Sequence, residues 1–108
     1  MTDRYILNAS GEPEPCEDLL TWAHWFETAN RRVCHDMDEG QGADAVRVST
    51  VFLGLDHRFG GNGPPILWET MVFGGPLDGE GRRYISRDDA FKGHQLICQQ
   101  VSAASVKP

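Results

Sequence analysis

Two apolar runs on either side of a Gly- and Pro-rich loop constrain this chain more than any other feature. The runs Val46 to Leu55 and Ile66 to Phe73 are rich in β-branched and aromatic residues, which favour strands. The ten residues Asp56 to Pro65 between them predict a long loop joining two antiparallel strands. Both alternating sets of positions in each run are largely apolar, as in strands that are covered on both faces or that form an interface.

The rest of the chain alternates helical and strand patterns. Arg4–Asn8 is a short β-type run, and apolar spacing of 3.6 residues predicts a helix over Leu19–Cys34. Arg82–Ser86 predicts a shorter strand, and Ser86 caps a last helix over Asp88–Val101. The buried stripe expected for the first helix is Leu19, Trp22, Ala23, Phe26, Asn30 and Val33, and that for the second is Ala90, His94, Ile97 and Val101.

These patterns predict an α+β domain with the order β-α-β-β-β-α, in which two helices pack on one face of an antiparallel sheet. A chain of 108 residues is expected to form a single domain, with residues 1–3 and 102–108 frayed. The expected core is Trp22, Phe26, Phe52, Trp68, Val72 and Ile97. Because two helices can cover only one face, the other apolar face predicts a homodimer or an obligate partner.

The composition narrows the possible partners. The net charge is −6, and residues 1–54 hold ten of the sixteen acidic residues but four of the ten basic ones. Such a chain has no basic surface for nucleic acid or anionic lipid, and charge alone favours a basic partner. No apolar run approaches the roughly 20 residues that span a bilayer, and no export signal is visible. The three cysteines are therefore expected to be reduced thiols in a cytosol.

The long loop is the first candidate site. Asp56, His57 and Arg58 leave the strand end, and Phe59 and Asn62 belong to the same loop, which either binds a ligand or is an inert hairpin tip. It carries no P-loop or dinucleotide fingerprint. Asp56 and His57 with Glu69 would suit acid–base work, but no motif exposes a nucleophile, so no catalytic residue is assigned.

Metal binding is a second possibility. Cys34 and His35 are adjacent, and His94 and Cys98 lie one helical turn apart, which would let both reach one ion. No CxxC or HxxxH pair accompanies them, and His94 falls on an apolar stripe. It is therefore interpreted as a core residue bonded to a backbone carbonyl, and no metal or cofactor is expected.

Trp25 is a third candidate. On the predicted helix it falls on a flank with Arg32, a composition typical of interaction hot spots. The alternative is a tryptophan packed over the flank against the segment EPEP, residues 12–15.

Several segments resemble one known family. VSTVFLGLDH (48–57), PPILWETMVFGGPLDG (64–79), RYISRDDAFKGH (83–94) and DLLTWAHWFETANRRV (18–33) are similar to a signature of small proteins encoded by tailed phages and prophages. The resemblance covers about residues 5–100. It implies a phage-type accessory protein in the cytoplasm of a bacterial host, a setting that favours inhibitors and sponges over metabolic enzymes, and it assigns no functional residue.

We therefore expect a non-catalytic binder that blocks or sequesters a host bacterial protein, in an anti-defence or host-takeover role. Its expected contacts are Trp25, Arg32 and the loop Asp56–Gly63. The alternative is a small-ligand (nucleotide) binding protein or hydrolase that uses the same loop with Glu69.

Overall fold

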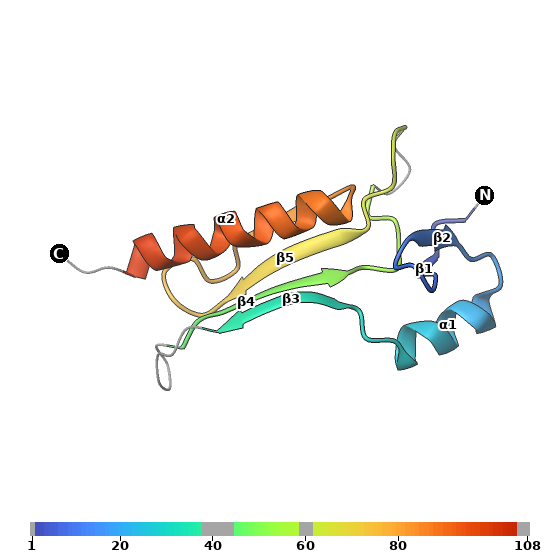
Figure 1. The fold of residues 1–108 in the computed structure, drawn as a ribbon, viewed down its shortest axis with the longest axis horizontal. Helices are drawn as coiled ribbons and strands as arrows, with labels where there is room; N and C mark the ends of the chain where they lie inside the picture. The colour runs from blue at the N-terminus through green and yellow to red at the C-terminus, as the bar shows by residue number, and fades with distance from the viewer. Residues whose placement is uncertain (1, 38–44, 59–61, 106–108) are drawn as a thin grey trace.

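The fold combines two antiparallel sheets with two helices (Figure 1). A computed structural model describes residues 2–37, 45–58 and 62–105. In chain order the elements are β1 (Tyr5–Leu7), β2 (Pro13–Pro15), α1 (Leu19–Thr28), β3 (Arg32–Met37), β4 (Arg47–Phe52), β5 (Trp68–Phe73), β6 (Gly81–Tyr84) and α2 (Arg87–Ser105). The α+β class is confirmed, and the order broadly matches the predicted one, with β2 and β3 as additional strands.

The larger sheet has the order β3-β4-β5-β6, with every neighbouring pair antiparallel. The two apolar runs of the sequence form its central strands, as predicted. Alternation turns Val48, Thr50 and Phe52 of β4 toward α2, and all three are buried. Figure 1 shows α2 lying along this face.

The second helix matches its prediction closely. Its four expected core positions, Ala90, His94, Ile97 and Val101, are all buried. The Ser86 hydroxyl accepts a hydrogen bond from the Asp89 amide at 3.1 Å, as expected of an N-terminal cap. The tail predicted to fray from residue 102 instead continues the helix to residue 105, and residues 106–108 lie outside the described part.

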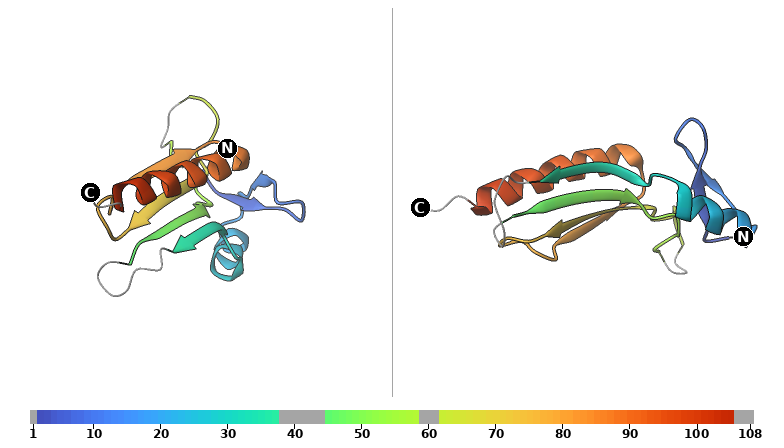
Figure 2. Two further views of the ribbon diagram at one scale, coloured as in Figure 1. Left: turned by 60° about the vertical axis from the view of Figure 1, so that its left-hand side comes forward. Right: turned by 90° about the horizontal axis from the view of Figure 1, so that it is seen from below.

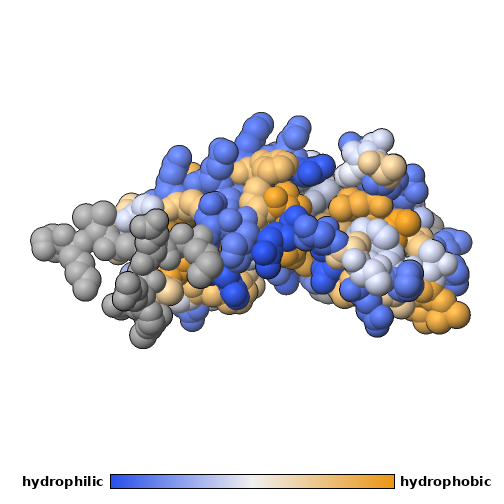
Figure 3. All heavy atoms as spheres, turned by 60° about the horizontal axis from the view of Figure 1, so that its bottom comes forward, coloured by the Kyte–Doolittle hydropathy of each residue, from blue (hydrophilic) through white to orange (hydrophobic). Residues whose placement is uncertain are grey.

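The first helix is shorter than predicted and lies elsewhere. It ends at Thr28, and residues 32–37 form the strand β3, so the predicted extension to Cys34 is wrong. The predicted buried stripe is wrong in part. No residue of α1 is fully buried, and Leu19 is 56% exposed, whereas Trp22, Ala23 and Phe26 are half-buried. Figure 2 shows α1 beyond the end of the large sheet, beside β1 and β2, so α2 alone covers the sheet face. Figure 3 shows hydrophobic residues exposed at this end of the molecule.

One backbone carbonyl joins this N-terminal part to the sheet. The Gly54 oxygen accepts hydrogen bonds from the Tyr5 amide and from Nε1 of Trp22, both at 2.9 Å. Gly54 has φ +73°, and a Cβ there would lie 3.1 Å from the Phe26 ring, so only glycine fits without strain. Trp22 and Phe26, expected in the core, are half-buried and stack at 4.9 Å.

The other four predicted core residues are buried as expected. Phe52 and Trp68 belong to a cluster with Leu67 and Ala90, and Val72 and Ile97 belong to a second one. The two clusters lie between the sheet and α2.

Candidate functional site

A line of polar side chains crosses the sheet beneath α2. Thr50 and Thr70 lie opposite each other on β4 and β5, and both are fully buried. Their hydroxyl oxygens are 2.5 Å apart, and the Tyr84 hydroxyl on β6 donates to Thr70 at 3.0 Å. Threonine suits a strand because it is β-branched, but a buried hydroxyl needs a partner, and each of these has one.

His94 continues this line from α2. Its side chain is 3% exposed, with Nδ1 2.7 Å from the Thr50 hydroxyl and Nε2 2.6 Å from Oδ2 of Asp36 on β3. The prediction of a buried histidine is confirmed. Its partners are side chains, however, whereas the sequence pattern suggested a backbone carbonyl. We call this set the buried polar line; it runs from β6 to β3, the two outer strands of the described sheet, through Tyr84, Thr70, Thr50, His94 and Asp36.

The hydrogen-bonding chemistry of these partners determines which atom donates and which accepts at each step. An ionised Asp36 only accepts, so Nε2 of His94 carries the hydrogen and Nδ1 of a neutral ring accepts from Thr50. Thr50 then accepts from Thr70, and Thr70 from Tyr84. The hydrogen bond with His94, and after it that with Cys98, lowers the pKa of the Asp36 carboxyl below its ordinary value.

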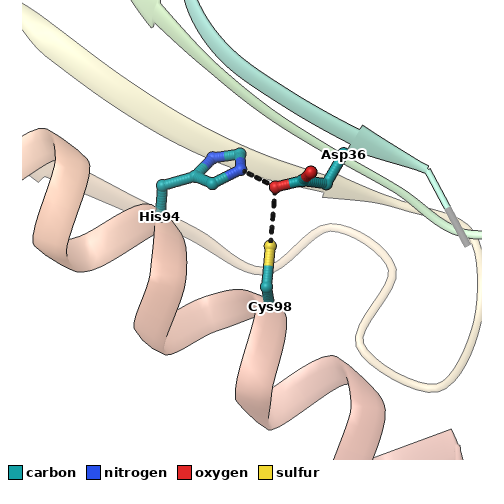
Figure 4. Close-up of side chains that lie close together, drawn as sticks. All are labelled: Asp36, His94 and Cys98. Atoms are coloured by element: carbon teal, nitrogen blue, oxygen red, sulfur yellow. Dashed lines mark hydrogen bonds and ion pairs between the residues drawn. The ribbon is translucent and has the colours of Figure 1, made fainter.

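Cys98 lies one turn after His94 on the same helix. Its sulfur is 3.4 Å from Oδ2 of Asp36. Figure 4 shows Cys98 and His94 both directed at this carboxylate oxygen. Burial raises the pKa of the Cys98 thiol to about 11, and the neighbouring Asp36 adds to this effect. The thiol is therefore protonated at neutral pH, which does not suit a nucleophile. The oxygen, nitrogen and sulfur donors of Asp36, His94 and Cys98 all lie within 4.8 Å of one another, a set that can hold a metal ion.

The predicted binding loop is closed by its own residues. Oδ1 of Asp56 accepts from the amides of Arg58 and Ile66, both at 2.9 Å, and Nε of Arg58 donates to the Pro64 carbonyl at 2.8 Å. Asn62 is exposed. Phe59, with Gly60 and Gly61, lies outside the described residues. The Asp56 carboxylate thus has a structural task in the loop.

Glu69 and His57, which the sequence suggested for acid–base work, each make another contact. Glu69 accepts from Nε of Arg83 at 2.8 Å in an ion pair. Nδ1 of His57 lies 2.8 Å from the Leu55 carbonyl, to which it donates. These contacts hold the end of β4 and join β5 to β6.

Trp25 and Arg32 occupy different environments. Trp25 is half-buried and packs edge-on against Phe52, with ring centroids 5.8 Å apart. Arg32 is exposed at the start of β3, opposite Val51. It lies on a strand, and the helix flank that was predicted to unite the two residues does not extend to it.

The face of the large sheet opposite α2 is the second feature with a functional composition. We call it the open face; its register positions are Arg32, His35, Arg47, Ser49, Val51, Glu69, Met71, Phe73 and Arg83. It contains a hollow of about 280 Å³ lined by Ser49, Val51, Glu69, Met71 and Phe73 among others. Phe73 is 42% exposed, with the Arg47 guanidinium 4.4 Å from the centre of its ring. The apolar pattern on both faces of these strands had indicated such a surface.

A larger hollow of about 590 Å³ lies on the other side of the sheet, between α2 and β6. Its apolar lining comes from Val72, Leu77, Ile97 and Ala104, and Arg82 is among its polar residues. Nothing in the sequence pattern indicated this hollow, because it arises where the long helix runs past the short strand β6.

Comparisons with protein-family models, curated proteins and solved structures find no match to this chain. Within the described residues, none of the helices has the length and apolar character needed to cross a membrane.

Proposed function

We propose that this chain is a non-catalytic binding protein that docks an acidic surface of a partner protein against its open face. The observation that carries the proposal is the composition of this face, which α2 leaves uncovered. Val51, Met71 and Phe73 supply apolar area there, and Arg32 and Arg47 supply positive charge in a chain whose net charge is −6.

This combination is typical of interface centres. Aromatic residues, methionine and arginine are enriched in protein interfaces, and buried aromatic and arginine anchors carry most of the binding energy. The exposed Phe73 with Arg47 over its ring is such a pair. Among the described residues of this face, Glu69 is paired with Arg83 and Asp78 lines the hollow, so Arg32 and Arg47 outnumber the remaining carboxylate. An acidic partner is therefore favoured over the basic one that net charge alone suggests.

The charge also favours a different protein over a second copy as the occupant. Two open faces brought together would place two arginines from each chain in one interface, which costs free energy where their charges are desolvated. A homodimer stays a prediction of the sequence and is one outcome of the test below. If the chain is the phage accessory protein that its motifs resemble, the partner is a host protein whose activity is blocked by occupancy of its surface.

The buried polar line supports a non-catalytic reading. Both ring nitrogens of His94 are occupied, and the ring is almost fully buried, so it offers a substrate no free base. The Cys98 thiol is protonated at neutral pH.

The test uses two matched aromatic–arginine pairs. Phe73 lies on the open face beneath Arg47, and Phe91, 38% exposed, lies on α2 with Arg87 5.5 Å from its ring. The chain is used as bait in host lysate, and the host protein retained stoichiometrically is purified for titration calorimetry. Phe73→Ser and Arg47→Glu should each weaken binding by at least about tenfold, whereas Phe91→Ser should leave it unchanged.

Added salt should also weaken the complex, because screening reduces attraction between arginines and carboxylates. Equal losses in the Phe73 and Phe91 variants would place the contact elsewhere. A homodimer that buries Phe73, detected by light scattering and lost in Phe73→Ser, would replace the partner with a second copy.

The hollow between α2 and β6 favours a second candidate, a small apolar ligand. Its volume falls in the range of small-molecule sites, and its lining is apolar with a few polar groups. Native mass spectrometry of the purified chain should then show a bound ligand that is lost in Ala104→Trp and retained in Phe73→Ser.

A further inference from the structure

We propose that Asp36, His94 and Cys98 form a binding site for a divalent transition metal ion of the zinc type. The site is separate from the open face, since these side chains lie on the α2 side of the sheet. It joins the outer strand β3 to the helix, and Asp36, whose side chain is 65% exposed, gives the ion a route from solvent.

The donor set is chemically apt. Imidazole nitrogen and cysteine sulfur are the ligands that zinc takes most often, and a carboxylate oxygen is common beside them. Three protein ligands leave a fourth position for water, as in sites of the open type. A hard ion such as Mg²⁺ would require oxygen ligands, so this set selects against it.

The geometry is close to that of a tetrahedral site. Ligand bonds of about 2.0 Å to nitrogen and 2.3 Å to sulfur place tetrahedral donor atoms roughly 3.3–3.6 Å apart. The Cys98 sulfur already lies 3.4 Å from Oδ2 of Asp36, and Nε2 of His94 lies 2.6 Å from the same oxygen. The contact between Nε2 and Oδ2 has to lengthen by about 0.7 Å to admit the ion, and the exposed Asp36 side chain has room to turn.

The surroundings hold His94 in the orientation that a metal needs. Its Nε2 faces the other two donors, and its Nδ1 is fixed by Thr50. A metal-bound histidine almost always donates its second ring N–H to a protein partner, which fixes the ring. Thr50 is that partner here, and Thr70 holds Thr50 in turn.

Binding requires one proton to leave and one to move. The Cys98 thiol loses its proton to solvent as the sulfur–metal bond forms. The proton on Nε2 of His94 is replaced by the metal, and the neutral ring carries its hydrogen on Nδ1, where it donates to Thr50. The hydroxyl hydrogens of Thr50 and Thr70 turn away from the ring, so the hydrogen bonds then run from His94 toward Tyr84. One proton per ion is therefore released overall, and the histidine and the carboxylate keep their charge.

Co²⁺ titration tests this assignment, because a sulfur–cobalt bond gives a charge-transfer absorption band. The chelator-treated, folded chain should bind one Co²⁺ with this band, bind Zn²⁺ in competition, and release about one proton per ion in weakly buffered solution. Cys98→Ser should abolish the band, and Asp36→Asn should weaken binding.

Cys16→Ser is the matched control, because Cys16 is buried and its thiol contacts the Asp18 carbonyl, far along the chain from the site. It should retain both the band and the affinity. The loss in Cys98→Ser should exceed the roughly 10–100-fold that removal of an outer partner costs. Circular dichroism confirms that each variant is folded. Absence of the band in the folded chain, or its persistence in Cys98→Ser, would overturn the proposal.

Discussion

Replacing Thr50 by valine removes one hydroxyl from the centre of the buried polar line and almost nothing else. Valine has nearly the shape of threonine, so no cavity forms. The hydroxyl is fully buried and bonds two groups, Thr70 at 2.5 Å and Nδ1 of His94 at 2.7 Å. Thr50→Val therefore leaves both groups buried without this partner.

The size of the effect follows from these two groups. Nδ1 of His94 is left without a partner, which costs about 1–3 kcal/mol, and Thr70, which keeps Tyr84, loses one hydrogen bond worth about 0.5–1.5 kcal/mol. The variant should therefore lose roughly 2–4 kcal/mol of unfolding free energy. This is a large fraction of the roughly 5–15 kcal/mol that stabilises a typical domain. For a chain of this size it corresponds to a fall in Tm of about 10–20 °C.

Urea unfolding followed by circular dichroism measures this loss, on metal-free protein. Thr50→Ser is the control, because it keeps the hydroxyl and loses one methyl group, at a cost of about 1 kcal/mol. If Thr50→Val is within about 0.5 kcal/mol of the unaltered chain, or is more stable than Thr50→Ser, the polar line does not contribute as described.

Three further predictions concern the same region. Gly93→Ala should destabilise the chain by about 1–3 kcal/mol in thermal melts, because the new Cβ would clash with the Tyr84 ring. In a Tyr84→Ala background the clash is gone, and the same change should stabilise the chain because alanine favours a helix more than glycine does. The pKa of Asp36 is lowered in the folded chain, so its contribution to stability is present above about pH 4 and is lost as pH falls through the folded pKa. Urea titrations from about pH 6 to about pH 2 should therefore show a fall in unfolding free energy that is smaller in Asp36→Asn. Alkylation of Cys98 near neutral pH, followed by peptide mass spectrometry, should be slow because its pKa is about 11, and Asp36→Asn should accelerate it.

The central strands and the second helix could be predicted because local pattern and tertiary environment agree there. Val46–Leu55 and Ile66–Phe73 can bury apolar area only as strands, and Ser86 marks the start of α2. The segment after Thr28 could not be predicted in this way. Val33 continues the helical spacing of α1 by coincidence, but pairing with β4 draws residues 32–37 into the sheet, and tertiary pairing overrides the local pattern.

The wrong assignment of residues 32–37 to a helix also concealed the cluster of Asp36, His94 and Cys98. The spacing of His94 and Cys98 was visible in the sequence, but Asp36 joins them only because β3 pairs with β4 in a register that turns Asp36 toward α2. The binding role of the loop stays a prediction of the sequence. The residue types of Asp56 and Arg58 suit function, yet their side chains are used to close the loop on its own backbone.

The outer strands of the large sheet have a consequence for how copies of this chain can assemble. β3 and β6 carry charged residues along their length, Arg32 and Asp36 on one and Arg82 and Arg83 on the other, and β6 has only four residues. Short, charged edges resist strand-by-strand addition of further chains. Association through strand addition is therefore disfavoured, and a contact that pairs the sheet face with one partner surface gives a closed complex.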